Sequence, residues 1–210
     1  MYAVRIGSRI LQVFWEPPKP KKQNGAIVGY RLCIKEKRSS HPCRSYVHMP
    51  ESQMNMHSFD DLKSFTMYNI QVQANTSVGY GPGQYLDYRT GETAPTAPPK
   101  DVVFKSVTTT SIEITWLPPE PEKRNGIIAM YEVEVFQEIS VSKVEKITKS
   151  LMRNITIWKI YDLSPRTNYI FHVRAGTAQG FGPAAIVHKR SEGRYPQTDQ
   201  STDKSKGRLT

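Results

Sequence analysis

The sequence predicts an all-β protein built from two small β-sandwiches in tandem. Three observations predict this fold class: an internal repeat, apolar residues that alternate with polar ones in each copy, and Pro-Pro and Asn-Gly pairs between the alternating runs. Alternation with period two is typical of strands that bury one face, and such residue pairs favour turns. No stretch longer than a turn or two keeps a helical period, which argues against a helical domain.

The repeat keeps rare residues in one register. A shift of 101 positions places Trp15 on Trp116 and Tyr68 on Tyr169, together with several Pro, Gly and Asn-Gly positions. Chance does not preserve such residues in order, so the pattern indicates two homologous domains of about 100 residues. The last residues are polar and show no alternation, which is typical of disorder. The predicted parts are domain 1 (residues 1–94), domain 2 (residues 95–191) and a disordered tail (residues 192–210).

The strands that should form each core follow from the alternation. In the first copy, Leu11, Val13 and Trp15 share one face, and residues 112–116 repeat this pattern in the second copy. Because successive side chains of a strand point to opposite faces, these runs predict half-buried strands. Two later strands are expected over residues 68–74 and 169–175.

Six motifs follow one another in the second copy: Trp116-Leu-Pro-Pro, Asn125-Gly-Ile-Ile, Tyr131-Glu-Val-Glu-Val, Leu163-Ser-Pro-Arg-Thr-Asn-Tyr169, Val173-Arg-Ala and Gly180-Phe-Gly-Pro. Their order resembles the fibronectin type III repeat, and the resemblance covers nearly the whole chain except the last twenty residues. The first copy departs slightly, because Leu32 and Ile34 replace two valines and Phe65 stands one residue after the site where the repeat usually has a proline.

The resemblance implies roles for four aromatic residues. Trp15 and Trp116 would fill the centres of the two sandwiches, so truncation of either to alanine would cost about 3 to 5 kcal/mol. Tyr68 and Tyr169 would form tyrosine corners, in which the ring is buried and the hydroxyl bonds back to the preceding connection. The proline-rich linker, residues 91–99, is expected to be a semi-rigid spacer that holds the domains end to end.

Two cysteines allow at most one disulfide. Cys33 has outward parity on its predicted strand, and a hairpin centred near Arg38 would set Cys43 opposite to it. Cross-strand neighbours are close enough for a disulfide after a small adjustment. Two other outcomes stay open: both thiols are free, or they form a metal site with His41 and His48.

Two sequons make Asn75 and Asn154 candidate sites of N-glycosylation. Asn75 is the preferred site, because it has outward parity at a strand end. Together with the cysteines, the sequons favour an extracellular or cell-surface location for the protein, although the sequence shows no secretory signal.

The formal net charge of +10 predicts attraction to polyanions. Basic residues in two segments of domain 1 are candidates for binding a heparan-type sulfated sugar, and the plainer alternative is that they are solvated loop residues. No nucleic-acid partner is expected. The candidates are Lys19, Lys21, Lys22, Lys37, Arg38 and Arg44.

The sequence contains no motif of a serine hydrolase, a zinc protease or a P-loop protein, so we expect no enzyme activity, no catalytic residue and no cofactor. We also expect no membrane insertion by this segment, because no apolar run approaches about 20 residues. Since no proline-rich lead precedes domain 1, we expect the natural chain to extend N-terminally.

The resemblance implies a protein-binding and spacer module of a cell-surface receptor or adhesion protein. Similar repeats occur in receptor tyrosine phosphatases and in neural immunoglobulin-type adhesion molecules. Two alternatives use the same repeat: a structural segment of an intracellular muscle giant, and a matrix element that binds heparan-type sugar. The fold does not separate these functions, because function depends on the sites that a fold carries.

Overall fold

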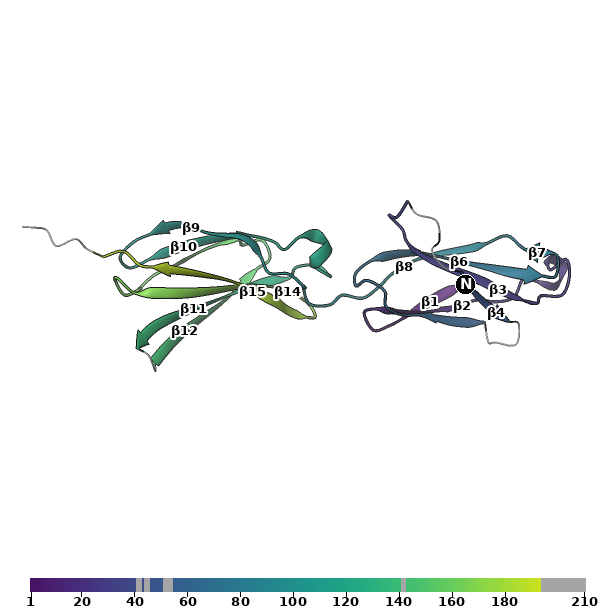
Figure 1. Ribbon diagram of the computed structural model, residues 1–210, viewed down its shortest axis with the longest axis horizontal. Coiled ribbons are helices and arrows are strands. Elements are labelled where there is room, and N and C mark those ends of the chain that lie inside the picture. Colours follow the sequence, from purple (N-terminus) through teal and green to yellow (C-terminus); the bar gives the residue numbers. More distant parts are fainter. Residues whose placement is uncertain (41–42, 44–45, 51–54, 141–142, 194–210) are drawn as a thin grey trace, which may run out of the picture.

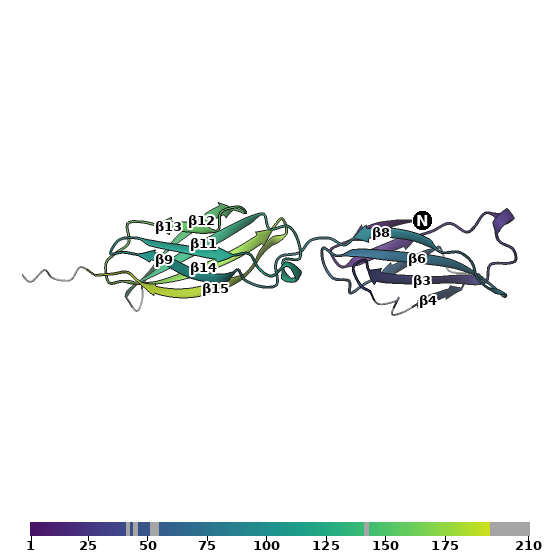
Figure 2. The same ribbon diagram turned by 90° about the horizontal axis from the view of Figure 1, so that it is seen from above.

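The computed structural model describes residues 1–40, 43, 46–50, 55–140 and 143–193. Two antiparallel β-sandwiches stand end to end and are joined by a short linker (Figure 1). Figure 2 shows the same elongated arrangement from above. The predicted all-β fold with two tandem sandwiches is therefore confirmed. The boundaries predicted for the domains stay predictions, and residues 194–210 of the predicted tail lie outside the described residues.

Domain 1 consists of two sheets whose strands pair antiparallel. In the larger sheet, β7 (Gly79–Tyr80) and β8 (Gln84–Arg89) both follow β6 (Met67–Thr76) on the same side, because Gly81, Pro82 and Gly83 interrupt the last strand. The smaller sheet has the order β1 (Tyr2–Ile6), β2 (Ile10–Phe14), β5 (Met56–Phe59). The larger sheet has the order β4 (Tyr46–Pro50), β3 (Gly29–Glu36), β6 (Met67–Thr76), followed by β7 (Gly79–Tyr80) and β8 (Gln84–Arg89).

Domain 2 repeats this topology with an uninterrupted last strand. Figure 1 shows the two layers of the sandwich, with β9 (Lys100–Val107) and β10 (Ile112–Leu117) above β11 (Met130–Ser140) and β12 (Lys143–Met152). The smaller sheet has the order β13 (Ile157–Ile160), β10 (Ile112–Leu117), β9 (Lys100–Val107). The larger sheet has the order β12 (Lys143–Met152), β11 (Met130–Ser140), β14 (Asn168–Thr177), β15 (Gly180–Arg190).

Helical structure among the described residues consists of two 3-10 turns, η1 (Pro20–Lys22) and η2 (Pro121–Lys123). Each turn precedes the strand that enters the larger sheet of its domain, β3 or β11. In this part of the chain, no helix has the length and apolar character needed to cross a membrane.

The alternating apolar residues form one core in each domain. Trp15 is 5% exposed and packs edge-on against Tyr30, with ring centroids 5.3 Å apart. Trp116 is 1% exposed and packs in the same way against Tyr131 at 5.6 Å. Such edge-to-face pairs stabilise a core beyond the burial of their area. The two tryptophans therefore lie at corresponding central positions.

Both predicted corner tyrosines are buried. The hydroxyl of Tyr68 accepts a hydrogen bond from the Lys63 N–H at 2.9 Å, and the hydroxyl of Tyr169 accepts one from the Ser164 N–H at 2.8 Å. Burial raises the pKa of Tyr68 above its ordinary value, because the phenolate would lose hydration there. Each tyrosine thus fixes the connection before β6 or β14.

The linker is held by hydrogen bonds on both of its sides. On the side of domain 1, the Gly91 carbonyl accepts a bond from the Phe65 N–H at 2.7 Å. On the side of domain 2, the Thr93 N–H donates to the Asn125 carbonyl at 3.0 Å, and the Asn125 side chain donates to the Ala94 carbonyl at 3.2 Å. These bonds add to the stiffness expected from the prolines.

Candidate functional site

The outer face of the larger sheet of domain 1 carries a group of interlocked polar and aromatic side chains. Arg31 on β3 donates two hydrogen bonds to Gln73 Oε1 on β6, from Nε at 3.1 Å and from Nη2 at 2.6 Å. The Arg31 guanidinium also lies 3.8 Å from the centre of the Tyr80 ring, a cation–π contact. Tyr80 in turn shares a 3.0 Å hydrogen bond with His48 Nδ1 on β4. We call Arg31, His48, Gln73, Tyr80 and Tyr85 the Arg31 face.

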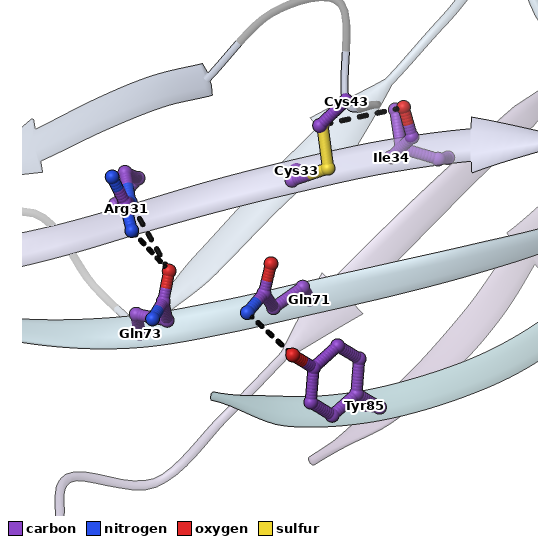
Figure 3. The surroundings of a disulfide bond; sticks show 7 residues. All are labelled: Arg31, Cys33, Ile34, Cys43, Gln71, Gln73 and Tyr85. Atoms are coloured by element: carbon purple, nitrogen blue, oxygen red, sulfur yellow. Dashed lines mark hydrogen bonds between the residues drawn. A yellow bond between two sulfur atoms is a disulfide. The ribbon is translucent and has the colours of Figure 1, made fainter. Parts of the chain in front are cut away.

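Exposed aromatic rings make this face accessible. Tyr80 is 41% exposed and Tyr85 is 64% exposed. The hydroxyl of Tyr85 accepts a hydrogen bond from Gln71 Nε2 at 2.8 Å (Figure 3). Gln73 Nε2 donates to the Gly81 carbonyl at 3.1 Å. These bonds hold the side chains in place before any partner binds. Sequence reasoning missed the group, although the outward parity of Arg31 and Gln73 was a signal that could have found it.

A disulfide joins Cys33 and Cys43 on the same outer face (Figure 3). Cys33 is 5% exposed, the two Cα atoms are 6.0 Å apart, and Cys43 Sγ lies 3.8 Å from the Ile34 carbonyl oxygen. The expected hairpin geometry is wrong, because the register partner of Cys33 is Tyr46. Cys43 instead belongs to the connection that precedes β4, and the disulfide ties this connection to the sheet.

The alternative metal site does not form in the structure. The sulfurs of Cys33 and Cys43 form a disulfide, so neither is a thiolate ligand. The His48 Nδ1 atom shares a hydrogen bond with the Tyr80 hydroxyl. His41 lies outside the described residues. Among the residues that are described, no group of three or more His, Cys, Asp or Glu side chains is arranged to hold a metal ion.

The structure does not bring the predicted basic residues together. Lys21 and Lys22 are exposed and lie in η1, which Lys19 directly precedes and which comes before β3. Lys37 and Arg38 follow the other end of this strand. Eight residues of β3 separate the groups by about 26 Å at roughly 3.3 Å per residue. Lys37 is also paired with Asp87 at 2.6 Å, and Arg44 lies outside the described residues. The described residues of the two segments thus lie at opposite ends of β3, and binding of a sulfated sugar by either segment stays a prediction.

The two sequons differ in exposure. Asn154 is exposed and lies in the turn between β12 and β13. Asn75 is half-buried inside the larger sheet of domain 1, where it pairs with Gly29 of β3 and with Tyr80 of β7. Because a glycan needs an accessible asparagine, this exposure favours Asn154 over the initially preferred Asn75. Occupancy of either sequon stays a prediction.

The corresponding face of domain 2 is dominated by charge pairs. Glu134 on β11 is 6% exposed and is bonded to Lys146 of β12 and to Arg174 Nη2 of β14, the latter at 2.7 Å. His172 Nδ1 lies 4.0 Å away, and Glu132 pairs with Arg174 at 3.1 Å. The Lys146 ammonium, with Arg174, holds the pKa of Glu134 below its ordinary value. The negative charge of the buried Glu134 carboxylate is therefore compensated by Lys146 and Arg174.

Comparison with known proteins gives matches along most of the chain. A family profile described as "Fibronectin type III domain" matches residues 2–86 and 97–189. The chain is 30% identical over 204 residues to the tyrosine-protein phosphatase Lar of Drosophila melanogaster. This alignment covers 91% of this chain and 9% of that protein.

Two further relatives show the same partial coverage. The chain is 33% identical to the ephrin type-A receptor 4-A of Xenopus laevis, over 80% of this chain and 18% of the receptor. It is 28% identical to the protein sidekick-1 of Mus musculus, over 80% of this chain and 9% of that protein. The chain thus spans less than a fifth of the length of each of these relatives.

Proposed function

Because the chain belongs to the fibronectin type III family, we propose that it is a non-enzymatic, protein-binding and spacer segment of a cell-surface receptor or adhesion protein. The observation that carries the binding part of this proposal is the Arg31 face. The spacer part is supported by two domains that stand end to end on a linker anchored at both sides (Figure 1).

The chemistry of the Arg31 face is that of a protein contact surface. Tyrosine and arginine dominate the energetic centres of protein interfaces, because they combine a large apolar area with a directional polar group. Here Arg31 is held by Gln73 and Tyr80, so little side-chain freedom remains to be lost when a partner binds. The Cys33–Cys43 disulfide lies on the same face.

The disulfide also supports the extracellular location. Disulfides persist in oxidising compartments and are rare in the cytosol. The Cys33–Cys43 bridge therefore favours an ectodomain over a segment of an intracellular muscle protein. The sulfated-sugar alternative has less support, because the described basic residues of the two segments lie at opposite ends of β3 and Lys37 is paired with Asp87.

The location is tested by mass spectrometry of the chain secreted from animal cells, with and without reduction. We expect a linked Cys33–Cys43 fragment and a glycan on Asn154. Free thiols together with unmodified asparagines would contradict the ectodomain proposal.

The binding function is tested with a multimer of the chain, screened against single cell-surface ectodomains displayed on cells. For a partner found in this way, we expect Arg31→Ala and Tyr80→Ala each to weaken binding by more than about tenfold, the effect typical of a central interface residue. The matched control is Ile186→Ala, which removes an exposed side chain from the corresponding face of domain 2. Equal losses for all three variants, or none for the first two, would contradict a role of the Arg31 face.

A further inference from the structure

The end of domain 2 that faces the linker holds the linker through a set of hydrogen bonds. The Asn125 side-chain amide donates to the Ala94 carbonyl at 3.2 Å and to Thr96 Oγ1 at 3.3 Å. From β14, the Thr177 hydroxyl donates to the Thr93 carbonyl at 2.9 Å. Backbone bonds join Thr93 N–H to the Asn125 carbonyl at 3.0 Å and Thr96 N–H to the Lys123 carbonyl at 2.9 Å. Domain 2 thus binds the linker through hydrogen bonds to its backbone and to Thr96.

Two glycines let the linker approach closely. A Cβ atom on Gly182 would lie 2.6 Å from the Pro95 carbonyl oxygen, and one on Gly126 would lie 3.1 Å from Glu92 Cδ. Glu92 in addition accepts a bond from the Ile127 N–H, through Oε1, at 3.3 Å. Glycine at both positions therefore leaves room for the bound segment.

Domain 1 carries the same residues at the corresponding positions of the repeat. The surrounding backbone also agrees: η1 and η2 are equivalent 3-10 turns, and the asparagines that follow them, Asn24 and Asn125, have φ angles of 50° and 52°. Because both asparagines have the same left-handed backbone conformation, their side chains leave the backbone in the same direction relative to the turn. The residues Lys22, Asn24, Gly25, Thr76 and Gly81 of domain 1 match Lys123, Asn125, Gly126, Thr177 and Gly182 of domain 2. We call the first five the Asn24 site.

The Asn24 site is open where its copy in domain 2 is covered. Gly126 is buried and Thr177 is 4% exposed, whereas Asn24 and Gly25 are exposed and Thr76 is half-buried. Within the described part of the chain, the Asn24 amide has no hydrogen-bond partner. The Thr76 hydroxyl donates only over a long 3.4 Å, to the Gly79 carbonyl.

We propose that the Asn24 site binds an extended protein segment with the chemistry of Glu92–Thr96. The same five residue types bind this chemistry in domain 2, and both backbones are preformed, so little structure has to change when the segment binds. The inference rests on the Asn24 site alone and does not depend on the Arg31 face.

Charge distinguishes the two sites and selects between ligands. The loop beside the site carries Glu120 in domain 2, where Lys100, which follows the linker, pairs with it at 2.5 Å. Domain 1 has Lys19 at the position of Glu120. A segment bound at the Asn24 site is therefore favoured by an acidic residue at the position that matches Lys100, directly after the linker.

The test extends the full chain by a copy of residues 92–101, placed directly before Met1. Each copied residue then has the same position in the repeat as it has before domain 2. We expect slowed hydrogen exchange at the copied threonine amides, shifted NMR signals of the Asn24 side-chain amide, and a rise of at least about 4 °C in the melting temperature of domain 1. A copy with the same ten residues in scrambled order is the control.

Variants then assign the effect to the site. Asn24→Asp keeps the shape of the side chain but removes its donor, so it should abolish the rise in the extended chain, whereas the matched Asn125→Asp should leave this rise in place. A copied segment that exchanges as fast as the scrambled one, or a rise that survives Asn24→Asp, would overturn the proposal. Glutamate in place of the copied Lys100 should add a further rise that disappears near 1 M salt, where the screening length is about 3 Å. Equal melting temperatures for the two copies would overturn the charge selection.

Discussion

At the residue scale, the hydroxyl group of one buried tyrosine in each domain binds a loop to the core. Tyr169 is 1% exposed, and its hydroxyl is the acceptor for the Ser164 N–H. The same arrangement recurs at Tyr68 with Lys63. Since a buried N–H without a partner loses hydration without compensation, each hydroxyl matters more than its size indicates.

We expect Tyr169→Phe to lower the free energy of unfolding of domain 2 by about 1 kcal/mol, because one net hydrogen bond of this size is lost. Urea denaturation measures the change. Tyr161→Phe is the control, since Tyr161 is 62% exposed, and it should leave the stability unchanged within about 0.5 kcal/mol. Equal effects of the two substitutions would contradict the role assigned to the corner.

At the scale of elements, the two domains stabilise the outer face of the larger sheet by different means. Cys33 and Glu134 occupy the same position of the repeat, on β3 and β11. In domain 1 this position forms a disulfide, and in domain 2 it forms a carboxylate bonded to Lys146 and Arg174. Both solutions tie neighbouring segments across the face.

Removal of the disulfide should destabilise domain 1 alone. The bridge closes a loop with a sequence separation of 10, for which the chain-entropy argument gives about 3 kcal/mol. We expect the double substitution Cys33→Ala and Cys43→Ala to lower the unfolding free energy of domain 1 by this amount. Amide NMR signals during denaturation report each domain separately, so domain 2 is an internal control. A common shift of both transitions would speak against a local effect.

Low pH should destabilise domain 2 through Glu134. Its pKa is lower in the folded chain than the ordinary value of 4.5, so its ion pairs contribute stability above about pH 4.5. This contribution is lost as the pH falls through the folded pKa, because the protonated acid no longer pairs with Lys146 and Arg174. Between pH 7 and pH 3, wild-type domain 2 should therefore lose more stability than Glu134→Gln, as measured by urea denaturation. Parallel losses would rule out this residue as the cause.

At the scale of the whole molecule, the joint between the domains is short. Gly91 is bound to domain 1 through its carbonyl, and the next residue, Glu92, is bound to the Ile127 N–H of domain 2. The nearest backbone anchors to the two domains are the Gly91 carbonyl and the Thr93 N–H, two residues apart. Such a joint transmits the direction of one domain to the next, as a spacer requires.

Loss of the Asn125 donor should loosen this joint. We expect Asn125→Asp to speed hydrogen exchange at the Thr93 and Thr96 amides on the order of tenfold, because two bonds that hold the linker are removed. Asn24→Asp changes the matched asparagine of domain 1 and should leave these amides unaffected. Unchanged exchange in Asn125→Asp would show that the Asn125 side chain does not order the linker.

The sequence by itself determined the two domains, their strands and their cores. Trp15 and Trp116, like Tyr68 and Tyr169, could be predicted because burial of one strand face imposes a period of two, and because the repeat keeps these large residues in register. The family resemblance rests on these same buried positions, since packing restricts them most strongly.

Only the tertiary structure decided which outward side chains and loops meet. The contact of Arg31 with Tyr80, the place of Cys43 before β4 and the separation of Lys22 from Lys37 depend on strand register and on loop paths. Solvated faces and loops have no periodic pattern that fixes their partners, so residues far apart in the sequence meet there only through the fold. The same reason explains why the docking of the linker onto Asn125 was visible only in three dimensions.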